Sequence, residues 1–363
     1  MTTNQAQSPQ KRIEYIDALR GLAMILVVFG HVEMTSFGFG SPAVTDTGSF
    51  ITAFHLPLFF WLSGFLSYKA NIKWNSATLL KISIDKALFL LVPALVLGII
   101  YTYTHLNTDF YSFITHNGKL GYWFTIALFE IFLILYTSNT ILYSPNPKTH
   151  RKRMLIALIV ISGVLFISKI ALKINPTLNY IGNIFTFHHS FNYFQYFAFG
   201  YICSMYKETF NKIIECKYLA AIIITLFSAL FYIKRCHITN FAGDGMSIYR
   251  MLDIIFEMII GYFGLLIVYN TFKTYQGSFT NDKKIGRTLQ FIGKRTLDIY
   301  LLHYFLLPHL PQIGQMLSDC SNATLELTVG LLISIIIICL CLIISSILRI
   351  SPFLAKWLFG VKQ

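Results

Sequence analysis

Long apolar runs separated by short polar and basic segments fill the chain from residue 14 to residue 348. Several runs exceed the roughly 18 apolar residues that a helix needs to cross the hydrocarbon core of a bilayer. The pattern therefore predicts an all-α fold, a polytopic membrane bundle of about ten transmembrane helices. The expected spans are residues 14–34, 49–68, 87–105, 122–143, 154–172, 183–205, 218–233, 249–270, 296–317 and 325–348.

The composition supports a chain whose main solvent is lipid. Hydrophobic residues make up 55% of the sequence, charged residues only 12%, and the mean hydropathy is +0.61. These values lie far from those of soluble domains. The formal net charge of +13 does not indicate a nucleic-acid partner, because the basic residues are dispersed among the loops between apolar runs.

The loop charges predict the orientation of the bundle. With a cytoplasmic N-terminus, 22 Lys and Arg residues fall on the inner side and six on the outer side. This asymmetry follows the positive-inside rule and places both termini in the cytoplasm. The predicted organisation is a cytoplasmic segment at 1–13, one transmembrane domain at 14–348 and a cytoplasmic tail at 349–363.

The start of the chain and the cysteines add little chemistry. Residues 1–10 are polar, and Arg20 interrupts the first apolar run, which is unlike a cleavable signal peptide, so we expect that run to be retained. The six cysteines lack metal-ligand spacing, and no metal site is predicted. Cys236 and Cys320 both fall on the predicted outer side, where either a disulfide or two free thiols would fit.

Two polar residues on the first span are the strongest chemical signal. Arg20 and His31 are eleven residues apart, so in a helix they share one face, separated by a rise of about 16 Å. Such groups are costly in a membrane unless they line an enclosed or watery cavity. Asp17 lies three residues before Arg20, where it can pair with the guanidinium. That pair is either a structural ion pair or an anion site.

The second span carries another histidine at a comparable depth. His55 lies in a run, residues 54–65 (FHLPLFFWLSGF), whose proline and Ser-Gly pair permit a kink and close helix contact. One membrane histidine is often a packing residue, but two on adjacent spans at one depth more often mark a site. Glu130 and His303 are weaker candidates, because an interhelical hydrogen bond explains each equally well. P-loop, GxSxG, HExxH and Rossmann motifs are missing from the sequence.

These residues together resemble a known family. Residues 17–23 (DALRGLA) with His31 are similar to the first-helix signature of the integral-membrane type-three acyltransferases, Arg and His separated by ten residues. Residues 54–65 resemble the second-helix motif of that family, closest to its sugar O-acetyltransferase branch. Residues 122–124 (YWF) and 297–303 (LDIYLLH) are similar to its looser later motifs. The ten predicted spans agree with the family architecture and cover nearly the whole chain.

The resemblance implies a reaction and roles for residues. Acetyl-CoA, as the acyl donor, would approach from the cytoplasm and transfer its acyl group to a hydroxyl of an envelope glycan or lipid-linked sugar. The implied location is a bacterial inner membrane, and a homodimer is compatible with the sequence. The resemblance then assigns catalysis to His31, as general base, with Arg20 and His55; donor binding to Arg20, Trp123, Arg151, Lys152 and Arg153; and acceptor binding to His55, Glu130 and His303.

A second class of function stays open at this point. Intramembrane charges also occur in transporters and flippase-like permeases, where they bind a moving solute. Against this reading, the sequence shows no inverted repeat and few signals for broken helices. Binding of an acyl-CoA would favour the acyltransferase, whereas solute flux without such binding would favour the permease.

Overall fold

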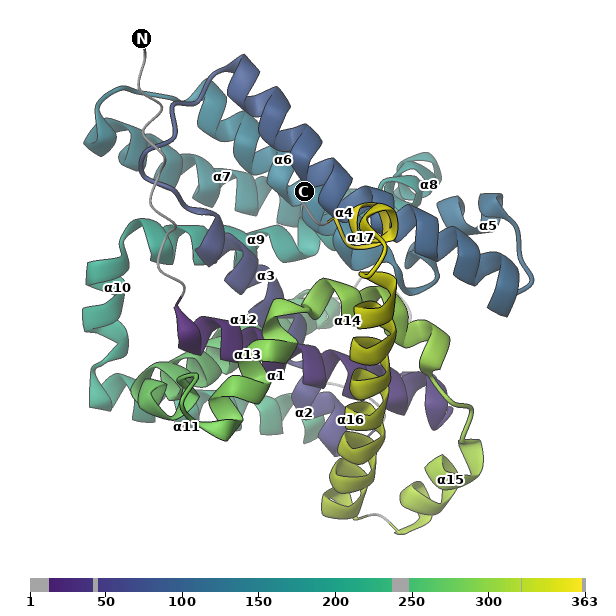
Figure 1. Cartoon of the computed structure of the whole chain (residues 1–363). Coiled ribbons are helices and arrows are strands. Elements are labelled where there is room, and N and C mark those ends of the chain that lie inside the picture. The colour runs from purple at the N-terminus through teal and green to yellow at the C-terminus, as the bar shows by residue number, and fades with distance from the viewer. Residues whose placement is uncertain (1–12, 42–44, 237–247, 321, 361–363) are drawn as a thin grey trace.

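The computed structural model describes residues 13–41, 45–236, 248–320 and 322–360 (Figure 1). It is 84% helical, and the described residues form no β-strand. The predicted all-α fold is thus confirmed. The longer helices are α1 (Glu14–His31), α4 (Ser76–His105), α6 (Trp123–Ile141), α7 (Pro147–Ile174), α9 (Phe187–Met205), α11 (Lys217–Cys236), α12 (Ile248–Thr274) and α16 (Ala323–Leu348).

Shorter helices connect the long ones or continue them. They are α2 (Asp46–Thr52), α3 (His55–Ser67), α5 (Phe110–Thr115), α8 (Pro176–Ile184), α10 (Lys207–Ile214), α13 (Lys284–Lys294), α14 (Thr296–Leu302), α15 (Pro311–Cys320) and α17 (Pro352–Phe359). A π-helical turn, η1 (Val32–Ser36), extends α1, and 3₁₀ turns occur at η2 (Lys119–Gly121), η4 (Gln276–Phe279) and η5 (His303–Leu306).

Within the described residues, eight helical segments are long and apolar enough to cross a membrane. Two of the ten expected spans are not among them. The sixth corresponds to α9, which has 19 residues but carries a polar stripe. The ninth, expected as one helix over 296–317, is wrong in its continuity: α14 and η5 end at Leu306, and α15 begins only at Pro311. A proline has no backbone N–H and disfavours helix in the residue before it, so Pro308 and Pro311 break this segment.

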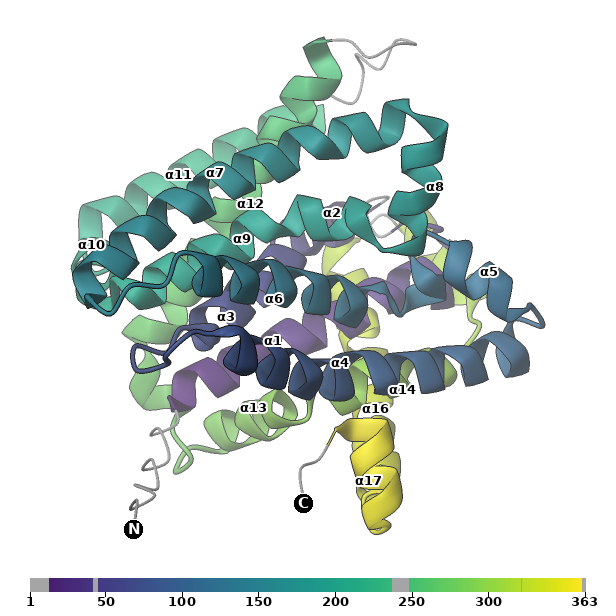
Figure 2. The same cartoon turned by 90° about the horizontal axis from the view of Figure 1, so that it is seen from above.

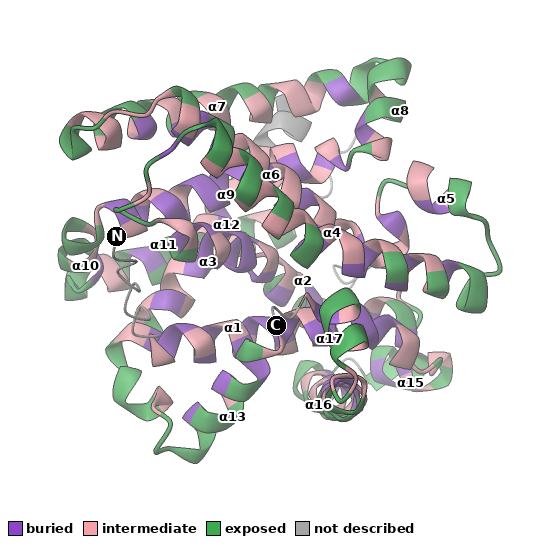
Figure 3. Ribbon diagram, turned by 45° about the horizontal axis from the view of Figure 1, so that its top comes forward, coloured by how far each residue is buried: buried purple, intermediate pink, exposed green. Residues whose placement is uncertain are grey.

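The first two spans form the centre of the molecule. In the most apolar window of the segment Glu14–Ser36, 72% of residues are buried inside the protein, and 61% in that of Asp46–Ser67. The corresponding share is only 11% for α7 and for α11, which expose aliphatic side chains. Figure 3 shows this contrast between α1 and the peripheral helices. The polar residues of the first two spans are therefore enclosed by protein.

Glycines bring pairs of helices into backbone contact. A Cβ atom at Gly64 of α3 would lie 1.9 Å from the carbonyl oxygen of Phe197, and one at Gly200 of α9 would lie 2.0 Å from that of Trp61. Helix α13 meets α1 in the same way at Gly21, where an added Cβ would lie 2.0 Å from the oxygen of Leu289. Such small residues permit the close helix packing that stabilises bundles in lipid. They fix α9 and α13 on the two central spans.

The broken ninth segment runs beside α1 in the same direction. Thr296 at the start of α14 bonds Arg20, Tyr304 in η5 bonds His31, and the amide of Leu310 donates to the oxygen of Ser36 over 2.7 Å. The segment is anchored elsewhere by buried Asp298, which accepts a bidentate pair of hydrogen bonds from Arg349 at 2.9 and 2.8 Å. Helices α14 and η5 thus form a second wall along the Arg20–His31 face.

The chain ends pack differently from one another. Residues 1–12 of the expected N-terminal segment lie outside the described residues. In the expected C-terminal tail, α17 lies against α4 (Figure 1), and Gly360 reaches the ring of Phe89. The tail is therefore structured up to Gly360 and packs against the middle of α4. Of the two cysteines considered for a disulfide, Cys320 is a free thiol, and the side chain of Cys236 lies outside the described residues.

Candidate active site

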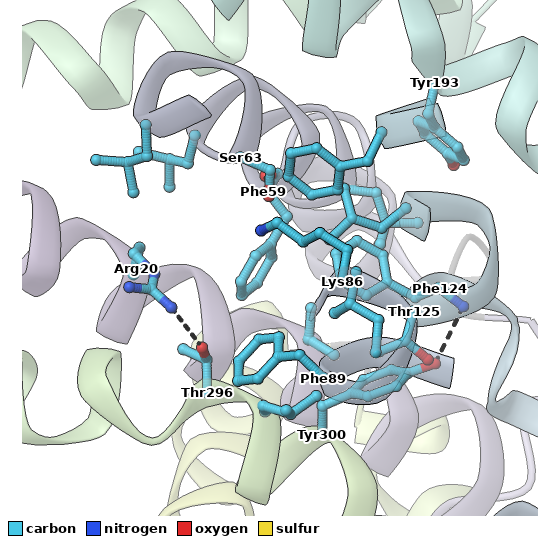
Figure 4. A pocket seen from close by; sticks show the side chains of 18 of the residues that line it. Arg20, Phe59, Ser63, Lys86, Phe89, Phe124, Thr125, Tyr193, Thr296 and Tyr300 are labelled. Atoms are coloured by element: carbon cyan, nitrogen blue, oxygen red, sulfur yellow. Dashed lines mark hydrogen bonds between the residues drawn. The ribbon is translucent and has the colours of Figure 1, made fainter. Parts of the chain in front are cut away.

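A cavity of about 960 Å³ runs between the central helices and α4, α6 and α14. Arg20 and Lys69 line it toward the predicted cytoplasmic side, and His31 and His55 line it toward the predicted outer side. Figure 4 shows Arg20, Lys86 and Tyr300 from three different helices around this space. The cavity therefore joins the two polar positions that the sequence placed on one face of the first span.

Arg20 is held by two side chains. Its Nη2 donates to Thr296 Oγ1 over 3.0 Å (Figure 4), and its Nη1 lies 3.6 Å from Asp17 Oδ1. The predicted pairing of Asp17 with Arg20 is confirmed. About a third of the Arg20 side chain remains exposed, and this residue lines the cavity. A partly exposed guanidinium that lines a cavity is suited to binding an anion or a polarised carbonyl.

His31 is held by one of its two ring nitrogens. Its Nε2 lies 3.0 Å from the hydroxyl of Tyr304, and that hydroxyl donates to the carbonyl oxygen of Gly121 over 3.1 Å. When the phenol donates to Gly121 it accepts from Nε2, and in this arrangement the ring proton lies on Nε2. The other nitrogen, Nδ1, has no hydrogen-bond partner within the described part of the chain. That nitrogen therefore carries the free lone pair.

The loop before α6 sets the position of Tyr304. Gly121 has a φ of +109°, and a Cβ atom there would lie 2.4 Å from the Tyr304 ring. The Gly121 oxygen also accepts a hydrogen bond from Tyr300 over 2.8 Å, and Tyr300 in turn accepts from the amide of Phe124 over 3.1 Å. Because both tyrosines meet one carbonyl, a single strained turn fixes this side of the site.

Two further histidines lie near His31. His55 lines the same cavity, and its Nδ1 lies 3.0 Å from the oxygen of Ile51. The His303 ring centroid is 5.1 Å from that of His31, and its Nδ1 donates to the oxygen of Tyr300 over 2.7 Å. His303 is fully buried and is not among the residues that line the cavity. The structure thus brings all three histidines together, with His303 behind His31 rather than in the open space.

Stacked rings form the wall opposite Arg20. Trp123 lines the cavity and stacks on His189 with ring centroids 4.0 Å apart. Tyr193 also lines the cavity and stacks on Phe60 at 4.6 Å. Flat, rigid surfaces of this kind hold a sugar ring or a pantetheine chain without a specific charge. Trp123, which was expected to bind the donor, is one of the residues that line the cavity.

The basic residues at the cavity are not those expected from the loops. Lys69 and Lys86 line it, and Lys86 Nζ lies 4.0 Å from the centre of the Phe132 ring. The three adjacent residues predicted to bind the donor lie on the first turns of α7 and do not line the described cavity. They are Arg151, which lies over Tyr68 at 6.0 Å, with Lys152 and Arg153.

Comparison with known proteins then decides the family. The profile of the acyltransferase domain of acyltransferase family 3 matches residues 13–348. The chain belongs to this family. The match and the apolar helices make it a multi-pass integral membrane acyltransferase. Comparison with curated proteins and with solved structures found no match.

Glu130 was expected to bind the acceptor, but in this acyltransferase it lies outside the cavity. It accepts hydrogen bonds from Thr186, at 3.0 Å, and from Ser190, and it is not among the cavity-lining residues. Lys119 is 1% exposed and donates to the backbone oxygens of Ile114 and Asn183. Burial lowers the pKa of Lys119 to about 8, and the charge of Glu130 opposes that shift. These contacts indicate a structural role for Glu130 and Lys119 next to η2, the turn that precedes α6.

Sequence reasoning missed three residues of the acyltransferase site. Tyr304 directly follows the histidine of the 297–303 motif, so the motif was one residue too short to include it. Thr296 directly precedes the same motif. In the sequence, Lys86 contributes only to the number of basic residues on the predicted cytoplasmic side. If residues 296–304 are treated as one segment that packs against the first span, Thr296 and Tyr304 are both included in the site.

Proposed function

We propose that this chain transfers an acetyl group from cytoplasmic acetyl-CoA to a hydroxyl of an envelope glycan in a bacterial inner membrane. The observation that carries the proposal is the position of His31. It lines a cavity that also reaches Arg20, its Nε2 is held by Tyr304, and its Nδ1 is unpartnered within the described part of the chain. A neutral imidazole held at one nitrogen is suited to accept a proton at the other.

The donor would occupy the half of the cavity near Arg20. Lys69, Lys86 and Arg20 supply positive charge there, offset in part by Asp85, and this charge suits the phosphates and the thioester of an acyl-CoA. The pantetheine arm would extend along the face of α1, whose rise from Arg20 to His31 is about 16 Å. Trp123 would pack against this arm. The thioester carbonyl then lies near His31, at the end of the cavity where an outer acceptor arrives.

The reaction needs one proton movement at His31. His31 Nδ1 removes the proton from the acceptor hydroxyl as its oxygen attacks the thioester carbonyl. The carbon–sulfur bond then breaks, an ester forms, and the proton passes to the thiolate of coenzyme A. The hydroxyl oxygen of Tyr304 stabilises the transient imidazolium through Nε2–H. His55 lines the same end of the cavity, where it would orient the acceptor.

The test is acetyl transfer by the His31→Ala variant in purified, reconstituted protein. We expect a loss of about 10²–10⁴-fold, the usual contribution of a general base. His309→Ala is the matched control, because His309 is exposed and does not line the cavity. Equal Tm values for both variants would show that folding is intact. Full transfer by His31→Ala would refute the role of the base, and solute flux into vesicles without any acetyl-CoA binding would favour a permease instead.

A further inference from the structure

Three of the six basic residues on the predicted outer side lie near one another. Lys169 and Lys173 lie one turn apart near the outer end of α7, and Lys234 lies near the outer end of α11. Lys234 Nζ pairs with Glu257 Oε1 of α12 over 2.6 Å. Lys173 and Glu257 both lie close enough to Lys169 to interact with it electrostatically. Three ammonium groups and one carboxylate leave this cluster with a net positive charge.

Lys169 is the innermost member of this cluster and belongs to a membrane-spanning helix. Its Nζ donates to Asn192 Oδ1 of α9 over 2.6 Å. A lysine at this depth is costly and normally serves a ligand, an ion pair or a path for charge. Asn192 is a neutral amide, so this hydrogen bond does not neutralise the ammonium charge of Lys169. The site is therefore suited to an anion.

An apolar groove of about 330 Å³ lies between α7, α9 and α12, on the inner side of Lys169. Leu158, Gly163, Phe166 and Met258 line it, and Gln195 is a polar member of its wall. Figure 2 shows α7 lying along the outside of α9, with α8 joining them. The groove is thus a hydrocarbon-lined channel on peripheral helices, and a cation lies beyond its outer end.

One turn of α9 separates this groove from the catalytic cavity. Asn192 binds Lys169, Tyr193 lines the cavity, and Gln195 lines the groove. Tyr193 and Tyr196 are adjacent rings at 6.2 Å, and Tyr196 donates to the oxygen of Met258 in α12 over 3.2 Å. A molecule with its chain in the groove and its anionic group at Lys169 would therefore present its polar end toward the cavity wall.

We propose that the groove and Lys169 bind the acceptor as a lipid phosphate: a single apolar chain in the groove, its phosphate at Lys169, and its sugar directed past Tyr193 toward His31. This inference rests on the proposed function for the identity of the sugar as acceptor. The charge of the cluster matches a phosphate, and the groove matches hydrocarbon. A bulk bilayer phospholipid fits less well, because the cation and the groove lie only one turn of α9 from the reaction cavity.

Binding of a polyisoprenyl phosphate to the full chain in detergent, followed by native mass spectrometry, tests the site directly. Lys169→Gln removes the charge, and Gly163→Leu fills the groove from a position where an added Cβ meets nothing within 4 Å. Lys148→Gln on the exposed first turn of α7 and Val164→Leu on its lipid-facing side are the matched controls. We expect both site variants to weaken binding at least tenfold and both controls to bind as the unmodified chain does.

Three results would overturn the inference. They are equal binding by all four variants, equal competition by inorganic phosphate, and equal competition by phosphatidylglycerol, which would indicate an ordinary bilayer lipid. The binding assay requires no acetyl transfer, so it separates this inference from the proposed function. Binding that depends on Lys169 and Gly163 in a chain that transfers no acetyl group would leave the site intact and refute the reaction.

Discussion

The hydroxyl of Tyr304 lies 3.0 Å from His31 Nε2 and 3.1 Å from the carbonyl oxygen of Gly121, so one phenol links the first span to the loop before α6. His31 and Tyr304 are 273 positions apart in the sequence. This bond fixes the orientation of the imidazole and the nitrogen that carries its proton. It also makes Tyr304 a positioning residue for the proposed base.

Tyr304→Phe should lower kcat for acetyl transfer about tenfold or more and change the KM for acetyl-CoA little. The reason is that loss of a hydrogen bond to a developing imidazolium costs about 1.5–3 kcal/mol. Tyr101→Phe is the matched control, because the Tyr101 ring packs against Tyr304 at 5.9 Å from a neighbouring helix and its hydroxyl makes no hydrogen bond to the described residues. A steady-state analysis that finds only a KM change would contradict the positioning role.

Arg20→Lys should raise the KM for acetyl-CoA by about tenfold. A lysine keeps the charge but loses the planar fork that bonds Thr296 at 3.0 Å and Asp17 at 3.6 Å while facing the cavity. Titration of acetyl-CoA binding by calorimetry checks the effect without turnover. Arg235→Lys, in the outer ion pair with Asp46, is the control and should bind normally. Unchanged affinity in Arg20→Lys would mean that Arg20 has only a structural role in the first helix and does not bind acetyl-CoA.

Gly121→Ala should destabilise the protein by about 1–3 kcal/mol, because its φ is +109° and an added Cβ would lie 2.4 Å from the Tyr304 ring. The measurement is thermal unfolding in detergent. Gly277→Ala serves as the control, since an added Cβ there meets nothing within 4 Å. If both variants unfold at the same temperature, the turn is not held by this contact.

The stability of the protein should rise between pH 8 and about pH 10.5 relative to that of Lys119→Met. Burial lowers the pKa of Lys119 to about 8, below the ordinary lysine value of 10.5. In this window the unfolded chain binds more protons at residue 119 than the folded chain does. Rising pH therefore favours folding, by at most about 1.4 kcal/mol per pH unit. If the free energies of unfolding of the two proteins change equally with pH across this window, the lowered pKa of Lys119 is disproved.

The cavity positions of Arg20, His31 and His55 could be predicted because they depend on local rules. A long apolar run must be helical in lipid, and helical geometry places residues eleven apart on one face. Arg151 and Glu130 show where that reasoning stops. A basic loop residue and a buried carboxylate have many partners available, and the sequence does not say which helix faces them. In the structure Arg151 lies over Tyr68, and Glu130 bonds Thr186.

The ninth segment shows the same limit at the level of the fold. Its apolar residues predicted one span, but two prolines and the close fit to α1 produce a short helix, a 3₁₀ turn and an extended link. Tyr304 lies in the 3₁₀ turn just before this break, and its hydroxyl is 3.0 Å from His31 Nε2.

The sequence by itself determined the membrane bundle, the predicted orientation and the shared face of Arg20 and His31, because hydropathy, charge bias and helical period act within one segment. Only the tertiary structure decided which nitrogen of His31 is held, which lysines line the cavity and how α14 lies along α1. Those features depend on contacts between segments as far apart as residues 31 and 304, and such contacts follow from the packing of the whole chain.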